Sequence, residues 1–283
     1  MKTPQFNRRH FLHASLLGST LALAGRAGAA VVKPERAPDD GLKLGMASYT
    51  YRSFSLDQAI AMTKEAGLKY INLKDVHLSL KSTKEECQAA REKIAAAGLK
   101  LMGGGVIYMK NNEEQIKSIF DYCVNAGMPV VVCSPEPDAL DTVEKFARQT
   151  GVMVAIHNHG PTDKTYPSPM DVYKMVKDRD PIMGICMDVG HTARIGVDPV
   201  ACINDCGDRL HDMHLKDETS ATPKGKPVEV GRGVLDIVGI FTALNARKYP
   251  YHIGLEYEAH QDNPQPGVRE SIGYARGVLA AIA

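Results

Sequence analysis

Short apolar runs alternate with longer segments of helical period along this chain, and that alternation limits the fold more than any other feature. From Gly41 onward the pattern repeats about eight times over roughly 240 residues, which is the size and rhythm of a closed (β/α)₈ barrel. We therefore expect an α/β fold, a single-domain TIM barrel spanning residues 42–283. The expected strands are residues 42–49, 70–76, 99–108, 129–134, 152–159, 184–191, 210–217 and 251–258.

The segments between these runs carry helix start and stop signals. Ser82 with Glu85 three residues later forms a capping-box pattern, and Gly98 closes that segment. An apolar stripe runs through residues 111–127 and stops at a glycine, and Ser168 precedes a proline at a first helical position. Helices are expected in all three places.

An open doubly wound sheet is the competing architecture. Such a sheet usually has a glycine-rich phosphate loop after its first strand, and residues 46–55, "MASYTYRSFS", are not one. The glycines 103–105 follow an apolar run but lack the GxGxxG spacing, so they indicate close packing or a tight turn. The barrel is the better prediction.

The N-terminus reads as an export signal. Residues 1–30 combine a basic start, a short apolar stretch and a small-residue end, and Arg8 and Arg9 followed by Phe11 and Leu12 resemble the twin-arginine pattern. The apolar part is too short and interrupted to span a membrane well. We expect a cleaved signal, a flexible lead-in over residues 31–41, and a periplasmic or otherwise exported mature protein without a stable membrane anchor.

Charge and cysteine content limit the partners. The formal net charge is only +1, so nothing in the overall balance favours nucleic acid as a partner. The six cysteines fall inside expected helices and strands with no CxxC pair, which favours buried thiols over disulfides.

Side chains suited to metal binding gather where the last four strands end. In a barrel of this kind these ends meet at one face, which is where the chemistry is found. Each residue alone could cap a helix or pack in the core, but so many carboxylates and imidazoles together would be costly without a cation. We therefore expect one bound divalent metal ion. The polar residues at these four ends, most of them of metal-ligand type, are His157, Asn158, His159, Asp188, His191, His214, Lys216, Asp217, Glu256 and Glu258.

The same stretches resemble a known family. "MDVGHT" (187–192), "HDMHLKD" (211–217) with "VEVGRGVLD" (228–236), and "IGLEYE" (253–258) are similar to the xylose isomerase-like barrels, which include hydroxypyruvate isomerase, inosose dehydratase, ketose 3-epimerases and endonuclease IV. The resemblance covers essentially the whole mature chain. It implies a metal held by Glu, Asp, His and Glu from strands five to eight.

Carried onto this sequence, the family pattern gives Asp188, His214 and Glu256 as the last three ligands. At strand five His157 stands in "VAIHNHGP" where the family has a glutamate, and its neighbour His159 is the alternative ligand on the same strand face. An imidazole still binds Mn²⁺, the first expectation, as well as Zn²⁺, Co²⁺ or Mg²⁺. Since ketose epimerases use two ligand glutamates as acid and base, the change puts simple C3 epimerisation in doubt.

The shared chemistry of that family starts with removal of a proton beside a carbonyl. A metal that chelates the carbonyl and the neighbouring hydroxyl stabilises the enediolate that forms. The expected acid and base groups are Glu256, His159, Lys216 and Glu136, although Lys216 could simply pair with Asp217. The expected substrate-binding residues are Lys74, His77, His191 and Arg232.

The leading expectation is a metal-dependent isomerase or epimerase acting on a keto sugar, cyclitol or related polyol. The first alternative is a metal-dependent lyase or dehydratase acting on a keto sugar or keto-glycoside. The others are an endonuclease IV-like phosphodiesterase, which needs more metal ligands and a basic surface, and a non-catalytic sugar-binding barrel. Dimers are frequent in the resembled family, so a homodimer is expected as well.

Overall fold

The computed structural model describes residues 41–282. The expected signal over residues 1–30, and all of the lead-in but Gly41, lie outside the described residues. Within the described part of the chain, none of the helices has the length and apolar character needed to cross a membrane.

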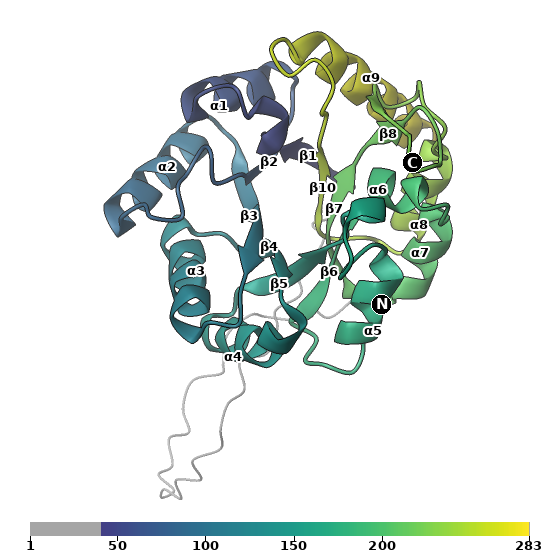
Figure 1. Ribbon diagram of the computed structural model, residues 1–283. Coiled ribbons are helices and arrows are strands. Elements are labelled where there is room, and N and C mark those ends of the chain that lie inside the picture. Colours follow the sequence, from purple (N-terminus) through teal and green to yellow (C-terminus); the bar gives the residue numbers. More distant parts are fainter. Residues whose placement is uncertain (1–40, 283) are drawn as a thin grey trace, which may run out of the picture. The chain divides into compact units, whose positions relative to one another are not determined.

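Eight parallel strands close into a barrel in the order β1-β10-β7-β6-β5-β4-β3-β2 (Figure 1). Every expected strand forms at its expected place, which confirms the predicted TIM barrel. The barrel strands are β1 (Lys43–Ala47), β2 (Tyr70–Leu73), β3 (Lys100–Met109), β4 (Val130–Pro135), β5 (Met153–His157), β6 (Met183–Asp188), β7 (Leu210–Leu215) and β10 (His252–Leu255).

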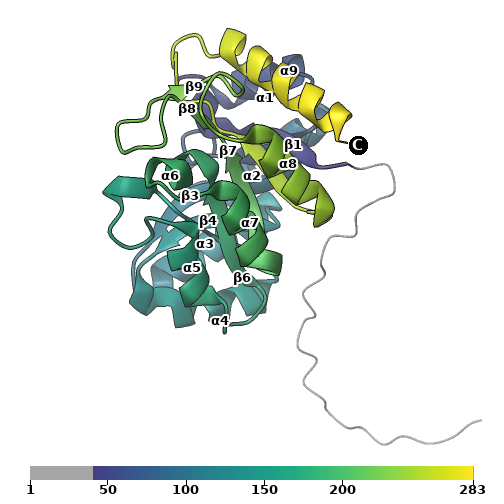
Figure 2. The same cartoon turned by 90° about the vertical axis from the view of Figure 1, so that its right-hand side faces the viewer.

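Helices surround the strands on the outside of the barrel (Figure 1). They are α1 (Leu56–Glu65), α2 (Lys84–Ala96), α3 (Glu113–Ala126), α4 (Leu140–Thr150), α5 (Pro169–Val176), α6 (Val189–Arg194), α7 (Pro199–Cys206), α8 (Ile237–Ala246) and α9 (Gln265–Ala281). A small hairpin, β8 (Asp217–Glu218) with β9 (Pro227–Val228), follows β7, and Figure 2 shows it at the same end of the barrel as α6. This is the end at which the strands finish.

The helix boundaries agree with the sequence signals, with one shift. α3 ends at Gly127, which adopts φ 70°, and Ser168 caps α5 as predicted. The capping box of α2 is formed by Thr83 and Glu86, one residue later than the Ser82 pattern predicted. The sequence "STKEE" contains two capping-box patterns, Ser82 with Glu85 and Thr83 with Glu86, and the helix uses the second.

The three glycines on β3 serve close packing, as expected. Gly105 has φ +143°, and a Cβ there would lie 2.0 Å from the carbonyl oxygen of Val132 on β4. Only glycine allows the two strands to approach in this way.

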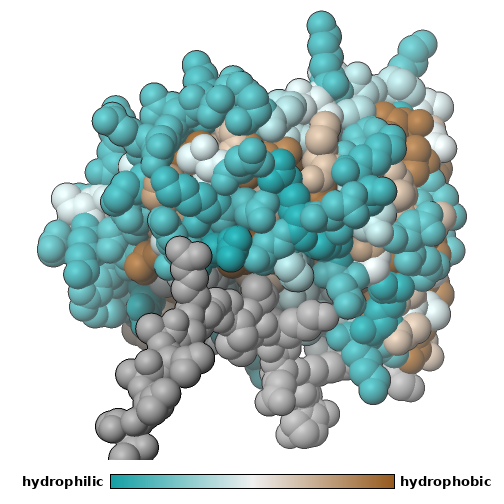
Figure 3. Space-filling view, turned by 90° about the horizontal axis from the view of Figure 1, so that it is seen from below, coloured by the Kyte–Doolittle hydropathy of each residue, from teal (hydrophilic) through white to brown (hydrophobic). Residues whose placement is uncertain are grey.

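The cysteines are free thiols buried in the core, as the sequence indicated. Outside the core, the face of the molecule in Figure 3 is mostly hydrophilic with scattered hydrophobic residues. Scattered apolar residues of this kind are ordinary on a folded surface.

A single buried carboxylate, that of Asp217, holds the loop after the β8–β9 hairpin. It accepts hydrogen bonds from the backbone N–H groups of Gly231, Gly233 and Leu235 at 2.9–3.1 Å. Asp217 is therefore committed to the loop, which corrects the alternative that it pairs with Lys216.

Asp217→Asn should lower the free energy of unfolding by about 2 kcal/mol, because hydrogen bonds to a charged acceptor are lost or weakened in a buried place. Urea denaturation measures the change. Asp178→Asn removes a carboxylate that is 87% exposed and should change stability by less than about 0.5 kcal/mol. Equal effects of the two substitutions would contradict this role of Asp217.

Candidate metal and active site

Four buried side chains converge at the carboxyl ends of neighbouring strands. His157 ends β5, Asp188 ends β6, His214 lies near the end of β7, and Glu256 directly follows β10. The strand register pairs Asp188 with His214, and His214 with Gly254 two residues before Glu256. Because alternate residues of a strand share a face, these four side chains point into the barrel together.

The distances within this four-residue set suit a single ion. Nδ1 of His214 lies 3.1 Å from Nε2 of His157 and 3.1 Å from Oε2 of Glu256. Nε2 of His157 lies 3.5 Å from Oδ2 of Asp188, and one ligand atom from each residue falls within 4.8 Å of all the others. Ligands about 2.0–2.2 Å from a common metal stand roughly this far apart.

Lys216, two residues after His214 and directly past the end of β7, supplies a buried positive charge beside the set. Its Nζ lies 3.1 Å from Oδ2 of Asp188 and 2.9 Å from Oε2 of Glu256, and it also contacts Glu258. Burial works to lower the pKa of Lys216, but these three carboxylates outweigh it and raise that pKa well above its usual value. The side chain is therefore a permanent ammonium group.

The same contacts fix the charge of the ligands. Burial works to raise the pKa of both carboxyl groups, yet Lys216 and the histidines hold the pKa of Asp188 and that of Glu256 well below their ordinary values. Burial lowers the pKa of His157 to about 3, so this imidazole is neutral and free to ligate. Burial also works to lower the pKa of His214, but the neighbouring Cys186 and Glu256 outweigh it and raise that pKa above its usual value.

The residues present fit a divalent metal ion. Two carboxylates and two imidazoles are a donor set suited to Mn²⁺, Zn²⁺ or Co²⁺. Oδ2 of Asp188 is fully buried and makes no directed hydrogen bond, and the Lys216 ammonium at 3.1 Å is the charge that compensates it, which suits an oxygen placed to meet a cation. A proton on His214 can balance charge when no metal is bound, and metal binding would displace it.

His159 and His191 lie beside the set without belonging to it. The ring of His159 is 4.5 Å from that of His157, and His191 lies 5.4 Å from His159. Of the two imidazoles, His157 and not His159 thus belongs to the four-residue set. Burial lowers the pKa of His159 and that of His191, and Nδ1 of His191 has no hydrogen-bond partner. Both can meet a substrate as neutral imidazoles.

Two other predicted binding residues are engaged in structural contacts. His77 is buried, with Nδ1 bonded to the Ser48 hydroxyl at 2.8 Å and Nε2 to the Tyr51 carbonyl at 3.1 Å. Both ring nitrogens of His77 are therefore engaged within the protein, and its role in substrate binding stays a prediction. Lys74 donates to the Val106 carbonyl at 2.6 Å and pairs with Asp75 at 3.2 Å.

Glu136 and Arg232 lie apart from the four-residue set. The exposed carboxylate of Glu136 accepts a hydrogen bond from the Asn111 backbone at 2.9 Å. Arg232 is 63% exposed, and its guanidinium pairs with Glu270 on α9. These contacts favour surface roles over the predicted roles in proton transfer and substrate binding. Sequence patterns gave their positions in loops but not the direction in which the side chains point.

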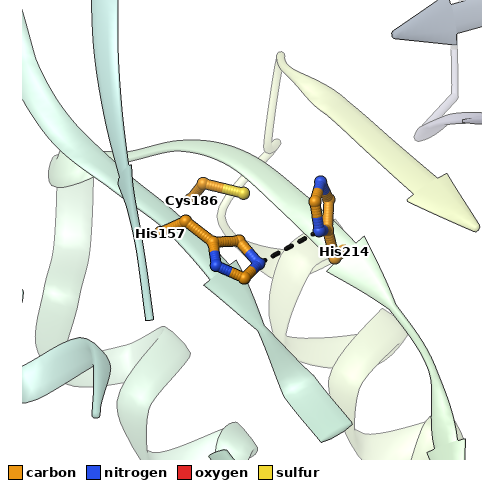
Figure 4. Close-up of side chains that lie close together, drawn as sticks. All are labelled: His157, Cys186 and His214. Atoms are coloured by element: carbon orange, nitrogen blue, oxygen red, sulfur yellow. Dashed lines mark hydrogen bonds between the residues drawn. The ribbon is translucent and has the colours of Figure 1, made fainter. Parts of the chain in front are cut away.

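Two buried groups near the four-residue set, Glu218 and Cys186, were not predicted as site residues. Glu218 follows β7 and is 1% exposed, and burial raises its pKa to about 7. Cys186 lies on β6 beside His157 and His214 (Figure 4). The signal for Cys186 was available, since it precedes Asp188 by two residues and so shares its strand face.

Removing one imidazole should disrupt metal binding. We expect His214→Ala to weaken Mn²⁺ binding by about 100-fold or more, because a ligand common to the set is lost. Isothermal titration of the metal-free protein measures the affinity. Glu136→Gln, which removes a carboxylate outside the set, should leave it unchanged, and an unaltered affinity in His214→Ala would refute the assignment.

The raised pKa of Glu218 predicts a pH-dependent stability difference. The folded protein holds this proton more tightly than the unfolded chain, so the associated stability is present below about pH 4.5 and is lost as pH rises through about 7. As pH rises from 5 to 8, the free energy of unfolding of Glu218→Gln should therefore increase relative to that of the wild type by on the order of 1 kcal/mol, as measured by chemical denaturation. The matched control is Glu114→Gln on α3. A difference that stays constant with pH would contradict the prediction.

The chain is similar in sequence to a curated protein. The chain is 28% identical over 162 residues to an inosose dehydratase of Mesomycoplasma hyopneumoniae, a match that covers 50% of this chain and 53% of that protein. The chain thus matches about half the length of this curated relative.

Solved structures share the fold. An uncharacterised protein from Parabacteroides distasonis has TM-score 0.66 at 24% identity, covering 83% of this chain and 98% of that one. A 3-keto-D-glucoside 4-epimerase from E. coli has TM-score 0.68 at 18% identity, covering 84% and 100%. The family model described as "Xylose isomerase-like TIM barrel" matches residues 60–278. The chain therefore belongs to the xylose isomerase-like TIM barrel family.

Proposed function

We propose that this protein is a metal-dependent enzyme that removes a proton beside the carbonyl of a keto sugar, cyclitol or related polyol, as an isomerase or epimerase. The observation that carries the proposal is the buried set of two imidazoles and two carboxylates at the carboxyl end of the barrel. Family membership supports the isomerase, epimerase or lyase kind of reaction.

Each group at the site has a role that follows from its surroundings. His157, Asp188, His214 and Glu256 would hold one divalent ion, which when bound polarises a carbonyl and acidifies the adjacent C–H. Lys216 keeps Asp188 and Glu256 ionised and fixed in position. It also holds Glu258 at the rim.

His159 is the best-placed proton acceptor. Burial lowers its pKa, so the imidazole is neutral near pH 7, yet its side chain is still 29% exposed and accessible from the barrel mouth. Glu256 is a weaker base because its pKa is held low. His191, whose ring lies 5.4 Å from that of His159, is proposed as a second polar contact for the substrate.

Two features favour a lyase or dehydratase as the second candidate. His157 replaces one of the two glutamates with which epimerases of the resembled family exchange protons on opposite faces, and the curated relative is named inosose dehydratase. If the sugar enediolate cannot be reprotonated from the opposite face, expulsion of a β-hydroxyl or a glycosidic oxygen becomes the competing outcome. A keto-glycoside would then be a substrate as well.

The remaining proposals concern partners and location. A small carbohydrate is proposed as the substrate and nucleic acid is not, since the net charge is +1. Export through the N-terminal signal, and assembly as a homodimer, are proposed on the sequence pattern and the resemblance alone.

Proton exchange with solvent tests the function most directly. With Mn²⁺ bound, the protein should transfer deuterium from D₂O into one or more of a panel of ketoses, inososes and 3-keto-glucosides, followed by NMR and mass spectrometry. His159→Gln should slow this by about 10²–10⁴-fold with Mn²⁺ affinity retained.

The product separates the two candidates. Isomerisation or epimerisation conserves mass, whereas elimination loses water or an alcohol. Sugar binding without any C–H exchange, in preparations loaded with each candidate metal, would refute the enzyme proposal and leave a sugar-binding barrel.

A further inference from the structure

Cys186 lies level with His157 and below Asp188 of the four-residue set. It precedes Asp188 by two residues on β6, so its side chain points to the same interior face but deeper in the barrel. The strand register pairs it with His157, and it is fully buried. Figure 4 shows its sulfur directed toward the two imidazoles.

Cys186, His157 and His214 form a second donor set. One ligand atom from each lies within 4.8 Å of the other two. Both imidazoles also belong to the set with Asp188 and Glu256. The two imidazole nitrogens that face each other are 3.1 Å apart, close to the spacing of about 3.3 Å for two nitrogens on one tetrahedral ion.

The two sets differ in chemical softness. The set with two carboxylates accepts the harder Mn²⁺ as well as Zn²⁺ and Co²⁺, whereas a thiolate beside the imidazoles disfavours Mn²⁺ and favours Zn²⁺, Cd²⁺ and Co²⁺. A cation bonded to the sulfur would be drawn deeper into the barrel and away from the mouth where a sugar would enter.

We propose that His157 and His214 serve two overlapping cation sites, an upper one completed by Asp188 and Glu256 and a lower one completed by Cys186 that takes thiophilic ions. The two sites share both imidazoles, so an ion in the lower site excludes one from the upper site. Zinc or cadmium would thereby displace manganese and block the face at which the proposed reaction occurs. The lower site goes beyond the proposed function, because it requires only the ligands and no catalysis.

Occupation of the lower site involves no redox change. The S–H bond of Cys186 breaks, its proton passes to solvent, and a sulfur–metal bond forms with the metal still divalent. Burial raises the pKa of the free thiol to about 12, so the thiol stays protonated until a cation replaces the proton.

Cobalt reports on the sulfur without any assay of activity. The metal-free protein is titrated with Co²⁺, and the near-ultraviolet absorption of a thiolate-to-cobalt charge transfer is followed. The wild type should develop this band with one equivalent of Co²⁺. Cys186→Ala should abolish it, and Cys133→Ala, which removes a buried thiol of β4 outside both sets, should retain it.

A variant of the upper site distinguishes two possibilities: two sites that share the imidazoles, or one site in which all five residues bind a single ion. Asp188→Asn removes an upper ligand but can still cap α6, and the charge-transfer band should persist. Cys186→Ala should weaken Cd²⁺ binding on the order of 100-fold and leave Mn²⁺ binding within about twofold.

Three results would overturn the proposal: a wild type with bound Co²⁺ but no thiolate band, a band unchanged in Cys186→Ala, or a band lost in Asp188→Asn. X-ray absorption of the wild-type Zn²⁺ complex needs no variant and should show one sulfur at about 2.3 Å. A zinc shell of nitrogen and oxygen alone would refute the lower site even if the variants failed to fold. Because none of these readouts involves a sugar, their failure is distinguishable from failure of the proposed enzymatic function.

Discussion

Two buried carboxylates, Asp188 and Glu256, require positive charge within a few ångströms, and the centre of this barrel is arranged around that requirement. Lys216 meets it from the end of β7 with its Nζ 3.1 and 2.9 Å from the two groups. Because the same ammonium also pairs with a third carboxylate, that of Glu258, it does not neutralise all of the negative charge. A divalent ion between these oxygens and the two imidazoles is the simplest way to supply it.

The barrel and four of the site residues could be predicted from the sequence. Strand alternation and helix signals predicted all eight barrel strands, and the ends of the last four pointed to His157, Asp188, His214 and Glu256. The reason is geometric, because parallel strands in a closed barrel bring their carboxyl ends to one face. The family pattern added which residue of each strand end belongs to the set, and the structure places these four together.

The surrounding roles could not be predicted in the same way. Whether Lys216 pairs with Asp217 or reaches across to Asp188 depends on loop paths, and Asp217 is occupied by backbone N–H groups of residues far along the chain. His77 and Arg232 found structural partners that no periodicity specifies. Glu218 went unnoticed because its raised pKa arises from burial, which a sequence does not display.

His157, which stands where the sequence resemblance implies a glutamate, connects the proposed reaction to the proposed lower site. It removes one acid–base carboxylate and adds an imidazole that faces both oxygen and sulfur donors. An anomalous-difference map from a crystal soaked in Mn²⁺ tests the metal site itself. One strong peak is expected about 2.0–2.3 Å from donor atoms of His157, Asp188, His214 and Glu256. A map with no peak there, and Lys216 still bridging the carboxylates, would contradict it.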